Sequence, residues 1–519
     1  MEDEIPNNDA EPEPIEGRRV PSGPEREPRL VIEPSAGLVG SALTWSAVQL
    51  VAERGFSVIR FLVLASLLSP DDFGLLAIAT VAVELLLTVT NVGLQPALVQ
   101  LQEREPRHYD AAWTVGLLRG LAISASVFLG AGLLAVLYGE PRATPVLQLI
   151  ALRPLLAGLA SPRLADLERG LNFRALALMT TTSTVVHTVL AIALAPTLGV
   201  FAIVVGMLAG TLVYAGLSYW AVPHRPRLRF DRPSISPLLR FGRWVLATSL
   251  VGVLGEAALR AVISRQLGAA ELGLYYLAAR LAYLPNGVVS NVVSSVAFPV
   301  HARLRHAPAK AAEALSISLR SLVALLVPTY LVLVALAPAL TRDALGPQWA
   351  GTPTLVTLLA GAAVLGLIAD SVFPMLEGRG EPDRITMLMS IRTVVLLAAA
   401  WPLAMRYGVA GAAVATIAAE IPVQILAATW ARSRLPRPFE GVGRVAAAAA
   451  VAGALGAAVG LGIDRLVGPP IGVAPAALTA GIVSMAGLWL LDRTLSLHLA
   501  EQLVLVFPAL RRWSRTVGV

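Results

Sequence analysis

Residues 61–100 read FLVLASLLSPDDFGLLAIATVAVELLLTVTNVGLQPALVQ. A short polar turn, Ser69-Pro-Asp-Asp72, separates two apolar runs, of which the first begins near residue 37 and the second ends near residue 97. A helix needs about 20 apolar residues to cross the roughly 30 Å hydrocarbon core of a bilayer. Both runs reach that length, and both are too long and too continuously apolar for the strands of a β-barrel. The stretch therefore predicts two membrane-spanning helices joined by a tight turn.

The same pattern continues along the chain, which has fourteen such apolar segments between residues 37 and 492. Of the 519 residues 56% are hydrophobic and 14% are charged, and the mean hydropathy is +0.70. Soluble domains carry about 25% charged residues, so the composition excludes a soluble enzyme and a nucleic-acid-binding domain. The absence of cysteine excludes thiol nucleophiles, disulfides and cysteine-based metal sites. The predicted fold class is an all-α polytopic membrane protein with about 14 transmembrane helices.

The basic residues indicate the orientation in the membrane, because cytoplasmic connections are enriched in Arg and Lys. With the N-terminus in the cytoplasm, the connections on the cytoplasmic side hold 20 Arg and Lys residues and those on the outer side hold four. A missed or additional span would exchange cytoplasmic and outer connections after it and would mix the basic-rich with the basic-poor connections. The division therefore supports fourteen spans in the cytoplasmic membrane, with both termini cytoplasmic.

Three pairs of segments repeat along the chain. They are Leu68–Ala79 with Leu267–Ala278 at an offset of 199, and Leu167–Arg174 with Leu376–Arg384 and Leu198–Ala202 with Tyr407–Gly411 at an offset near 209. Each offset corresponds to six spans, so the repeats predict two parallel six-helix lobes, the arrangement of transporters with a substrate site at the interface between repeats. Gly74 and Gly273 are expected at equivalent positions, where they let the first and second spans of each lobe pack closely.

These patterns predict six regions. They are a disordered, acidic and proline-rich cytoplasmic tail at 1–34, an N-terminal lobe at 35–221, a basic cytoplasmic linker at 222–242, a C-terminal lobe at 243–430, two appended helices at 431–493, and an amphipathic cytoplasmic tail at 494–519.

Three stretches resemble the polysaccharide transporter family, the Wzx-type flippases of lipid-linked oligosaccharides. They are residues 61–100, LERGLNFRALA at 167–177, and LGAAELGLYYLAARLAYLPNGVVSNVVSSVAFPVHARL at 267–304. The resemblance covers about residues 37–440. It implies the multidrug/oligosaccharidyl-lipid/polysaccharide exporter fold, in which two lobes surround a central cavity. It also implies a flippase without enzymatic activity, which moves undecaprenyl-diphosphate-linked oligosaccharide from the inner to the outer leaflet by alternating access.

Carrying a multiply anionic headgroup through hydrocarbon requires a cationic, hydrated cavity, because an unpaired charge is costly there. Nine Arg residues and five acidic residues lie within the predicted spans: Arg54, Arg60, Arg119, Arg153, Arg260, Arg265, Arg280, Arg320 and Arg392, with Glu53, Glu84, Glu256, Asp370 and Glu420. From this set, the residues expected to bind the diphosphate are Arg54, Arg60, Arg260 and Arg280. The first span is also similar to lipid II flippases at the Arg54 and Arg60 pair.

Other charged residues have alternative interpretations. Glu256 and Arg260 are four residues apart and can form a self-neutralising pair. Glu53 can form an ion pair with Arg60. The side chains of three further residues can snorkel to the membrane surface: Arg265, Arg320 and Arg392. Glu53, Glu84, Glu256 and Glu420 are candidates either for charge pairing or for coupling transport to H⁺ or Na⁺. His187 is interpreted as a hydrogen-bonded packing residue. No cofactor is expected, since the sequence has no nucleotide-binding motif.

The sequence is also compatible with two other functions. A non-transporting cell-wall scaffold would keep the fold but tolerate neutral replacement of the Arg residues, and a glycan polymerase or glycosyltransferase would need a larger outer loop than any of these connections. The expected partners are a polyprenyl-diphosphate-linked glycan and membrane lipids, together with a polysaccharide polymerase and glycosyltransferases, and not nucleic acid.

Overall fold

The structure is a computed structural model, which describes residues 36–90, 98, 105–223, 226–229, 243–469 and 472–495. The predicted N-terminal tail, nearly all of the C-terminal tail and most of the predicted linker lie outside these residues.

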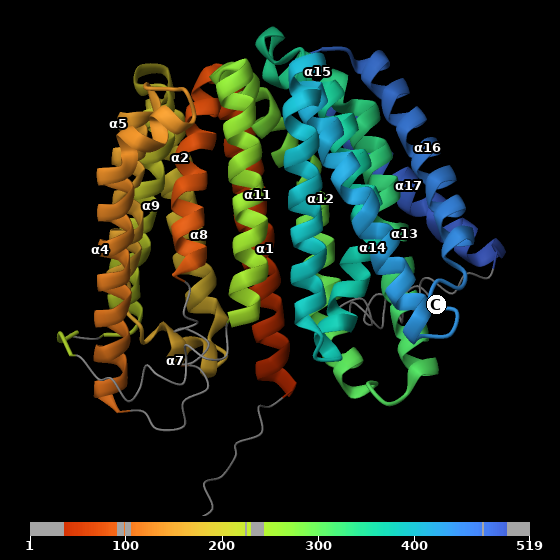
Figure 1. The fold of residues 1–519 in the computed structure, drawn as a ribbon, viewed down its shortest axis with the longest axis horizontal. Helices are drawn as coiled ribbons and strands as arrows, with labels where there is room; N and C mark the ends of the chain where they lie inside the picture. The colour runs from red at the N-terminus through yellow and green to blue at the C-terminus, as the bar shows by residue number, and fades with distance from the viewer. Residues whose placement is uncertain are drawn as a thin grey trace, which may run out of the picture.

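The described part of the chain is helical (Figure 1). The helices of the first half are α1 (Ala36–Leu67), α2 (Pro70–Val89), α4 (Pro106–Leu137), α5 (Ala143–Ile150), α6 (Leu152–Gly158), α7 (Leu164–Arg169), α8 (Phe173–Leu198) and α9 (Val200–Ala221). Those of the second half are α11 (Arg243–Leu267), α12 (Ala269–Arg303), α13 (Pro308–Leu340), α14 (Thr352–Gly378), α15 (Pro382–Arg434), α16 (Val442–Val467) and α17 (Val473–Leu495).

The helices account for the predicted number of spans. Nine helices in the described residues are long and apolar enough to cross a membrane. One of them, α15, is interrupted at Gly408 and supplies two spans. The helices α1, α2 and α11 and the consecutive pair α5 and α6 complete a set of fourteen. The predicted fold class is thus confirmed.

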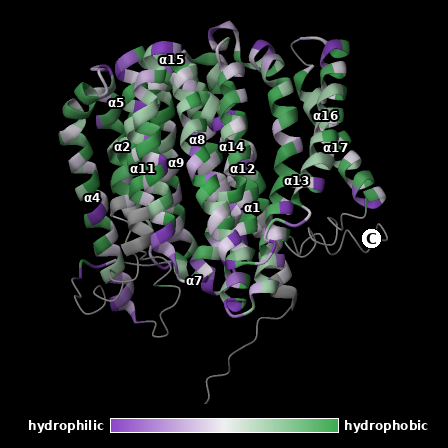
Figure 2. Cartoon of the chain, turned by 45° about the vertical axis from the view of Figure 1, so that its right-hand side comes forward, coloured by the Kyte–Doolittle hydropathy of each residue, from purple (hydrophilic) through white to green (hydrophobic). Residues whose placement is uncertain are grey.

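The surface of the bundle suits a lipid environment. Hydrophobic residues cover the middle of the helices and hydrophilic residues gather toward both ends (Figure 2). Large apolar side chains are exposed along the helices, including Leu129, Trp220 and Leu478. Exposed apolar surface of this extent indicates contact with a membrane.

The polar turn quoted at the start begins α2. The Ser69 side chain accepts a hydrogen bond from the Asp72 backbone N–H, and the Asp72 carboxylate accepts one from the Ser69 backbone N–H, which together form a capping box. Pro70 occupies the first helical position, where no backbone donor is needed. Asp72 also accepts a hydrogen bond of 3.2 Å from the backbone N–H of Val200. The turn therefore starts α2 and joins it to the beginning of α9.

Neighbouring helices form two lobes. In the first half α8 packs against α1 and α9, and α4 packs against α5 and α6, while in the second half α15 packs against α11 and α14, and α12 against α14. The last two helices, α16 and α17, pack on each other and on α13. The residue boundaries of the predicted domains stay predictions.

The repeat is visible in the backbone. Gly199, between α8 and α9, and Gly408, inside α15, are 209 residues apart and have φ values of 56° and 62°. The turns after α7 and α14 also match. The backbone N–H of Asn172 donates a hydrogen bond to the carbonyl of Leu167, and the backbone N–H of Glu381 donates one to the carbonyl of Leu376. Both bonds close the same type of helix C-terminus. These repeated turns agree with two lobes of common architecture.

The lobes meet through α2 and α12. A Cβ atom on Gly74 would overlap the carbonyl oxygen of Ala269, and one on Gly273 would overlap that of Pro70. The two glycines thus occupy equivalent positions in a reciprocal contact. The expectation that they join the first and second spans within each lobe was wrong: they bring α2 and α12 together across the lobes.

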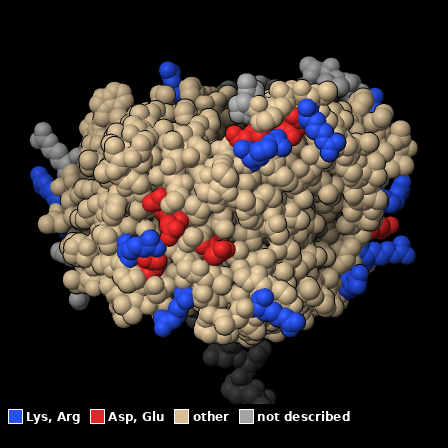
Figure 3. Space-filling view, turned by 90° about the horizontal axis from the view of Figure 1, so that it is seen from above, with Lys and Arg blue, Asp and Glu red and all other residues tan. Residues whose placement is uncertain are grey.

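Further contacts between the lobes lie at the same end of the bundle, which we call the α1–α2 end. The Trp349 indole donates a 2.7 Å hydrogen bond to the carbonyl of Ala65, and its fully buried ring packs edge-to-face on Phe73. The Tyr138 hydroxyl donates to the carbonyl of Ala257 at 3.0 Å, and Ser264 donates to the Tyr138 carbonyl at 2.8 Å. Seen from above, this end is mostly uncharged, with charged side chains in small groups (Figure 3). The lobes are thus held together at this end by buried contacts.

Candidate functional site

A cavity of about 900 Å³ lies between the lobes. Its wall is built by residues of α1, α2, α6, α8 and α9 from the first half and of α11, α12, α13 and α17 from the second. Five Arg and two Glu residues line it: Arg54, Arg60, Arg153, Arg260 and Arg280, with Glu84 and Glu256. The lining therefore has an excess of three positive charges at a place where the surrounding helices are apolar.

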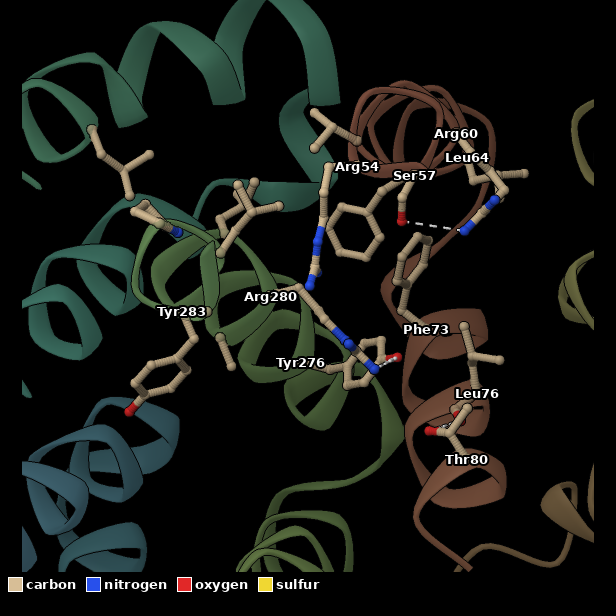
Figure 4. A pocket seen from close by; sticks show the side chains of 18 of the residues that line it. Arg54, Ser57, Arg60, Leu64, Phe73, Leu76, Thr80, Tyr276, Arg280 and Tyr283 are labelled. Atoms are coloured by element: carbon tan, nitrogen blue, oxygen red, sulfur yellow. Dashed lines mark hydrogen bonds between the residues drawn. The ribbon is translucent and has the colours of Figure 1, made fainter. Parts of the chain in front are cut away.

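The four Arg residues predicted to bind the diphosphate all line this cavity. Arg54 and Arg60 come from α1, and Figure 4 shows Arg54 extending into the space between α1 and α12. Arg60 donates hydrogen bonds to Thr188 on α8 at 3.2 Å and to Ser57 at 3.3 Å. The structure thus brings the predicted residues together, and their contact with a substrate stays a prediction.

Arg260 on α11 and Arg280 on α12 meet at one tyrosine. Their guanidinium carbons lie 5.6 Å and 5.2 Å from the centre of the Tyr276 ring, within the range of a cation–π interaction. Arg280 also donates a 3.1 Å hydrogen bond to the Tyr276 hydroxyl, drawn in Figure 4. Arg260 donates to the carbonyl of Ala77 on α2 at 3.3 Å. Tyr276 thereby holds the two cations at one place in the cavity wall.

The candidate acidic residues are paired mainly with Arg. Glu84 lies 3.8 Å from Arg280, and both side chains are about half exposed. Glu53 accepts a hydrogen bond from Gln49 at 3.0 Å. Because Arg60 bonds instead to Thr188 and Ser57, the alternative in which Glu53 holds Arg60 is not the arrangement seen.

A second charged cluster lies in the C-terminal half and centres on Arg392 of α15. The Arg392 Nε atom lies 2.6 Å from a Glu420 oxygen, and its Nη2 atom lies 3.9 Å from Glu256 on α11. Gln424 donates to the other Glu420 oxygen at 3.1 Å. Two sequence interpretations were therefore wrong: Arg392 is largely buried in an ion pair rather than snorkelling, and Glu256 pairs with Arg392 rather than with Arg260. The helix period places Glu256 near Arg260, but the packing of α15 supplies a closer cation.

Sequence reasoning missed Arg153 and His187 as residues of the cavity wall. Arg153 was visible as an intramembrane charge, but nothing in the sequence distinguished it from the other Arg residues. In the described part of the chain the buried Nε2 atom of His187 has no hydrogen-bond partner. Glycines at 206 and 210 pack directly on this residue. His187 is thus a packing residue as expected, but its buried Nε2 atom lacks the expected hydrogen bond, and the residue also lines the cavity.

The remaining intramembrane Arg residues have structural contacts. Arg119 donates to the Leu87 carbonyl at 2.7 Å and to the Thr90 hydroxyl at 2.9 Å, so it satisfies the C-terminal end of α2. Arg265 lies at the α1–α2 end beside the carbonyls that end α4, and Arg320 lies beside Gly441. Among the described residues no group of three or more His, Asp or Glu side chains is placed to hold a metal ion.

A comparison with protein families shows to which family the chain belongs. The profile of a family described as "Polysaccharide biosynthesis protein" matches residues 63–353, more than half of the chain. The chain belongs to this polysaccharide biosynthesis family. The expected membership of the Wzx-type polysaccharide transporters is thereby confirmed, and the protein is a membrane transporter of polysaccharide biosynthesis.

Curated relatives of this transporter cover most of its length. The succinoglycan biosynthesis transport protein ExoT of Rhizobium meliloti (strain 1021) is 29% identical over 339 residues, which are 65% of this chain and 68% of ExoT. The lipopolysaccharide biosynthesis protein WzxC of Escherichia coli (strain K12) is 24% identical over 66% of this chain and 70% of WzxC. The teichuronic acid biosynthesis protein TuaB of Bacillus subtilis (strain 168) is 22% identical over 70% of this chain and 78% of TuaB.

Solved structures share the fold of the transporter. The lipid II flippase MurJ in an inward closed conformation has a TM-score of 0.67 at 15% identity, over 87% of this chain and 99% of MurJ. An inward-facing multidrug resistance transporter of the MATE family has a TM-score of 0.62 at 16% identity, over 78% of this chain and 98% of its own. At these identities the likeness concerns the fold alone.

Proposed function

We propose that this transporter is a flippase, which moves an undecaprenyl-diphosphate-linked oligosaccharide from the inner to the outer leaflet of the cytoplasmic membrane by alternating access. The observation that carries the proposal is the cavity between the lobes, where Arg54, Arg60, Arg153, Arg260 and Arg280 face two Glu residues. Arg suits a diphosphate because its planar fork donates two hydrogen bonds to phosphate oxygens and stays ionised in a low dielectric.

The other part of the cavity wall is apolar and suits the lipid chain of such a substrate. It is formed by Val332, Leu333 and Leu336 of α13 with Val473 and Ala477 of α17. A polyprenyl chain can lie against this side while the headgroup contacts the Arg residues. A single cavity thus offers complementary surfaces to both parts of a lipid-linked glycan.

The contacts between the lobes support an inward-facing state. The α1–α2 end is closed by the Gly74 and Gly273 contact and by the Trp349 and Tyr138 hydrogen bonds. With the N-terminus in the cytoplasm, this end faces outward. A substrate would then enter from the cytoplasmic leaflet, and release would require these contacts to separate.

We further propose charge pairing, rather than binding of H⁺ or Na⁺, as the role of Glu84, Glu256 and Glu420. Each of these carboxylates lies within 4.0 Å of an Arg nitrogen. An adjacent guanidinium already compensates the charge of the carboxylate and repels a second cation.

Export assays test the proposal. Arg60→Ala removes charge-assisted contacts of about 1.5–3 kcal/mol each, and we expect the rate of surface glycan export to fall about 10-fold or more. Arg60→Lys should rescue export only partly, because it keeps the positive charge but loses the planar guanidinium group that donates two hydrogen bonds. The measurement is surface polysaccharide per amount of membrane-inserted protein, in a strain that lacks its own flippase.

Arg406→Ala is the matched control, because Arg406 is exposed on α15 and does not line the cavity. Its export should equal that of the unmodified protein. Normal export by alanine variants of all four predicted Arg residues would mean that the substrate binds elsewhere, whereas no export by the unmodified protein would favour the non-transporting scaffold.

The orientation can be tested separately with reporter fusions. Residue 140 follows α4 at the α1–α2 end, and residue 380 follows α14 at the opposite end. Alkaline phosphatase fused after residue 140 should be active, since it works only outside the cytoplasm, and a fusion after residue 380 should be inactive. The reverse result would mean that the cavity closes toward the cytoplasm in this structure.

A further inference from the structure

Tyr276 lines the cavity at the place where two Arg side chains meet. Its side chain is 6% exposed and lies where α11 and α12 face α2. Two guanidinium groups from different helices, those of Arg260 and Arg280, approach the same ring. Of these, Arg280 also bonds to the ring hydroxyl.

Two neighbouring cations repel each other, most strongly where water is scarce. An aromatic ring offsets this repulsion because the negative face of its quadrupole attracts each cation. The hydroxyl adds an acceptor that fixes the orientation of Arg280. Tyr276 can therefore keep both guanidinium groups at one ring before any ligand is present.

Both Arg residues retain donors for a ligand. A guanidinium has five N–H groups, and one of these is used by Arg260 toward Ala77 and one by Arg280 toward Tyr276. The acidic neighbour of Arg280, Glu84, is half exposed at 3.8 Å, a weak type of ion pair that an anionic ligand can displace.

We propose that Tyr276 is a positioning residue, which joins Arg260 and Arg280 into one anion-binding pair for the diphosphate of the lipid carrier. The inference rests on the proposed function, and it adds that two cations at one ring favour a diphosphate, with its two linked phosphoryl groups, over a monophosphate.

The inference can be tested by measuring ligand binding to the purified full-length protein in lipid nanodiscs. The two probes are undecaprenyl diphosphate and undecaprenyl monophosphate. Tyr276→Phe keeps the ring and removes the acceptor of Arg280, so we expect the affinity for the diphosphate to fall about threefold to tenfold. Tyr276→Leu removes both interactions and should lower it about 100-fold. The preference for diphosphate over monophosphate should fall in parallel.

Tyr275→Phe is the matched control. Tyr275 is the preceding residue and is equally buried, but its hydroxyl lies 3.4 Å from Thr416 and it does not line the cavity. Its affinity and its diphosphate preference should be unchanged. If Tyr276→Leu does not fold, the Tyr276→Phe and Tyr275→Phe pair still decides the question.

A double-mutant cycle separates positioning from general damage. Tyr276→Leu combined with Arg280→Ala should weaken binding by clearly less than the product of the two single losses, whereas its combination with Arg54→Ala should multiply the two losses. The inference would be overturned if the losses of affinity multiplied in both double variants. It would also be overturned if Tyr276→Phe kept the preference for diphosphate over monophosphate. Failure of the unmodified protein to bind either probe would instead contradict the proposed function.

Discussion

Cross-linking Gly139→Cys to Arg265→Cys is expected to stop transport completely and reversibly. A Cβ atom built on Gly139 would lie 3.8 Å from the Cβ atom of Arg265, the mean separation in disulfides. The first position belongs to the turn after α4 and the second to the end of α11, so the bond would fasten the lobes at the α1–α2 end. Because the chain contains no cysteine, only the introduced pair can form this bond.

The measurement is glycan translocation by the double variant under oxidising conditions and again after a thiol reductant. Each single variant is a control, and Gly139→Cys is needed in particular because φ at this position is +69°, which costs a non-glycine residue about 1–2 kcal/mol. Activity should be lost only in the oxidised double variant and should return on reduction. Full transport by fully cross-linked protein would show that the α1–α2 end does not open during the cycle.

Arg392→Leu is expected to destabilise the folded protein by about 3–5 kcal/mol, the usual consequence of leaving a buried charge without its partner. The Arg392 side chain is 15% exposed and that of Glu420 is 13% exposed, with 2.6 Å between their nearest charged atoms. Among the described residues, removing Arg392 leaves Glu420 with the hydrogen bond from Gln424 and removes the cation that lies beside Glu256. Thermal unfolding of the purified protein in detergent measures the effect.

Two further variants make this prediction specific. Arg392→Leu combined with Glu420→Gln should recover most of the stability, since it removes both charges and keeps an amide to bond with Gln424. Arg406→Leu, which removes an exposed Arg from the same helix, should change the stability by no more than about 0.5 kcal/mol. Equal losses for Arg392→Leu and Arg406→Leu would mean that the buried pair contributes nothing to the fold.

Several features of the fold and the site could be predicted from the sequence, because they depend on local properties. Each span follows from the length of an apolar run against the thickness of the bilayer. The turns at Gly199 and Gly408 follow from a backbone conformation that favours glycine, so they repeat in both lobes. Arg54 and Arg60 could be assigned to the interior because a guanidinium in an apolar helix avoids lipid wherever its partners lie.

The tertiary structure decided which of these groups meet. Glu256 and Arg260 share a helix face, yet Glu256 lies beside Arg392, more than 130 residues away, because α11 packs against α15. The same holds for Gly74 and Gly273, which join the lobes rather than the helices within each lobe. Tyr276 carries no charge that would reveal it in the sequence, and its position between two Arg residues exists only after α11 and α12 pack. The amino-acid sequence thus determined which segments span the membrane and which charges must avoid lipid, whereas pairing between charges depends on helix rotation and packing, to which residues far apart in the chain contribute.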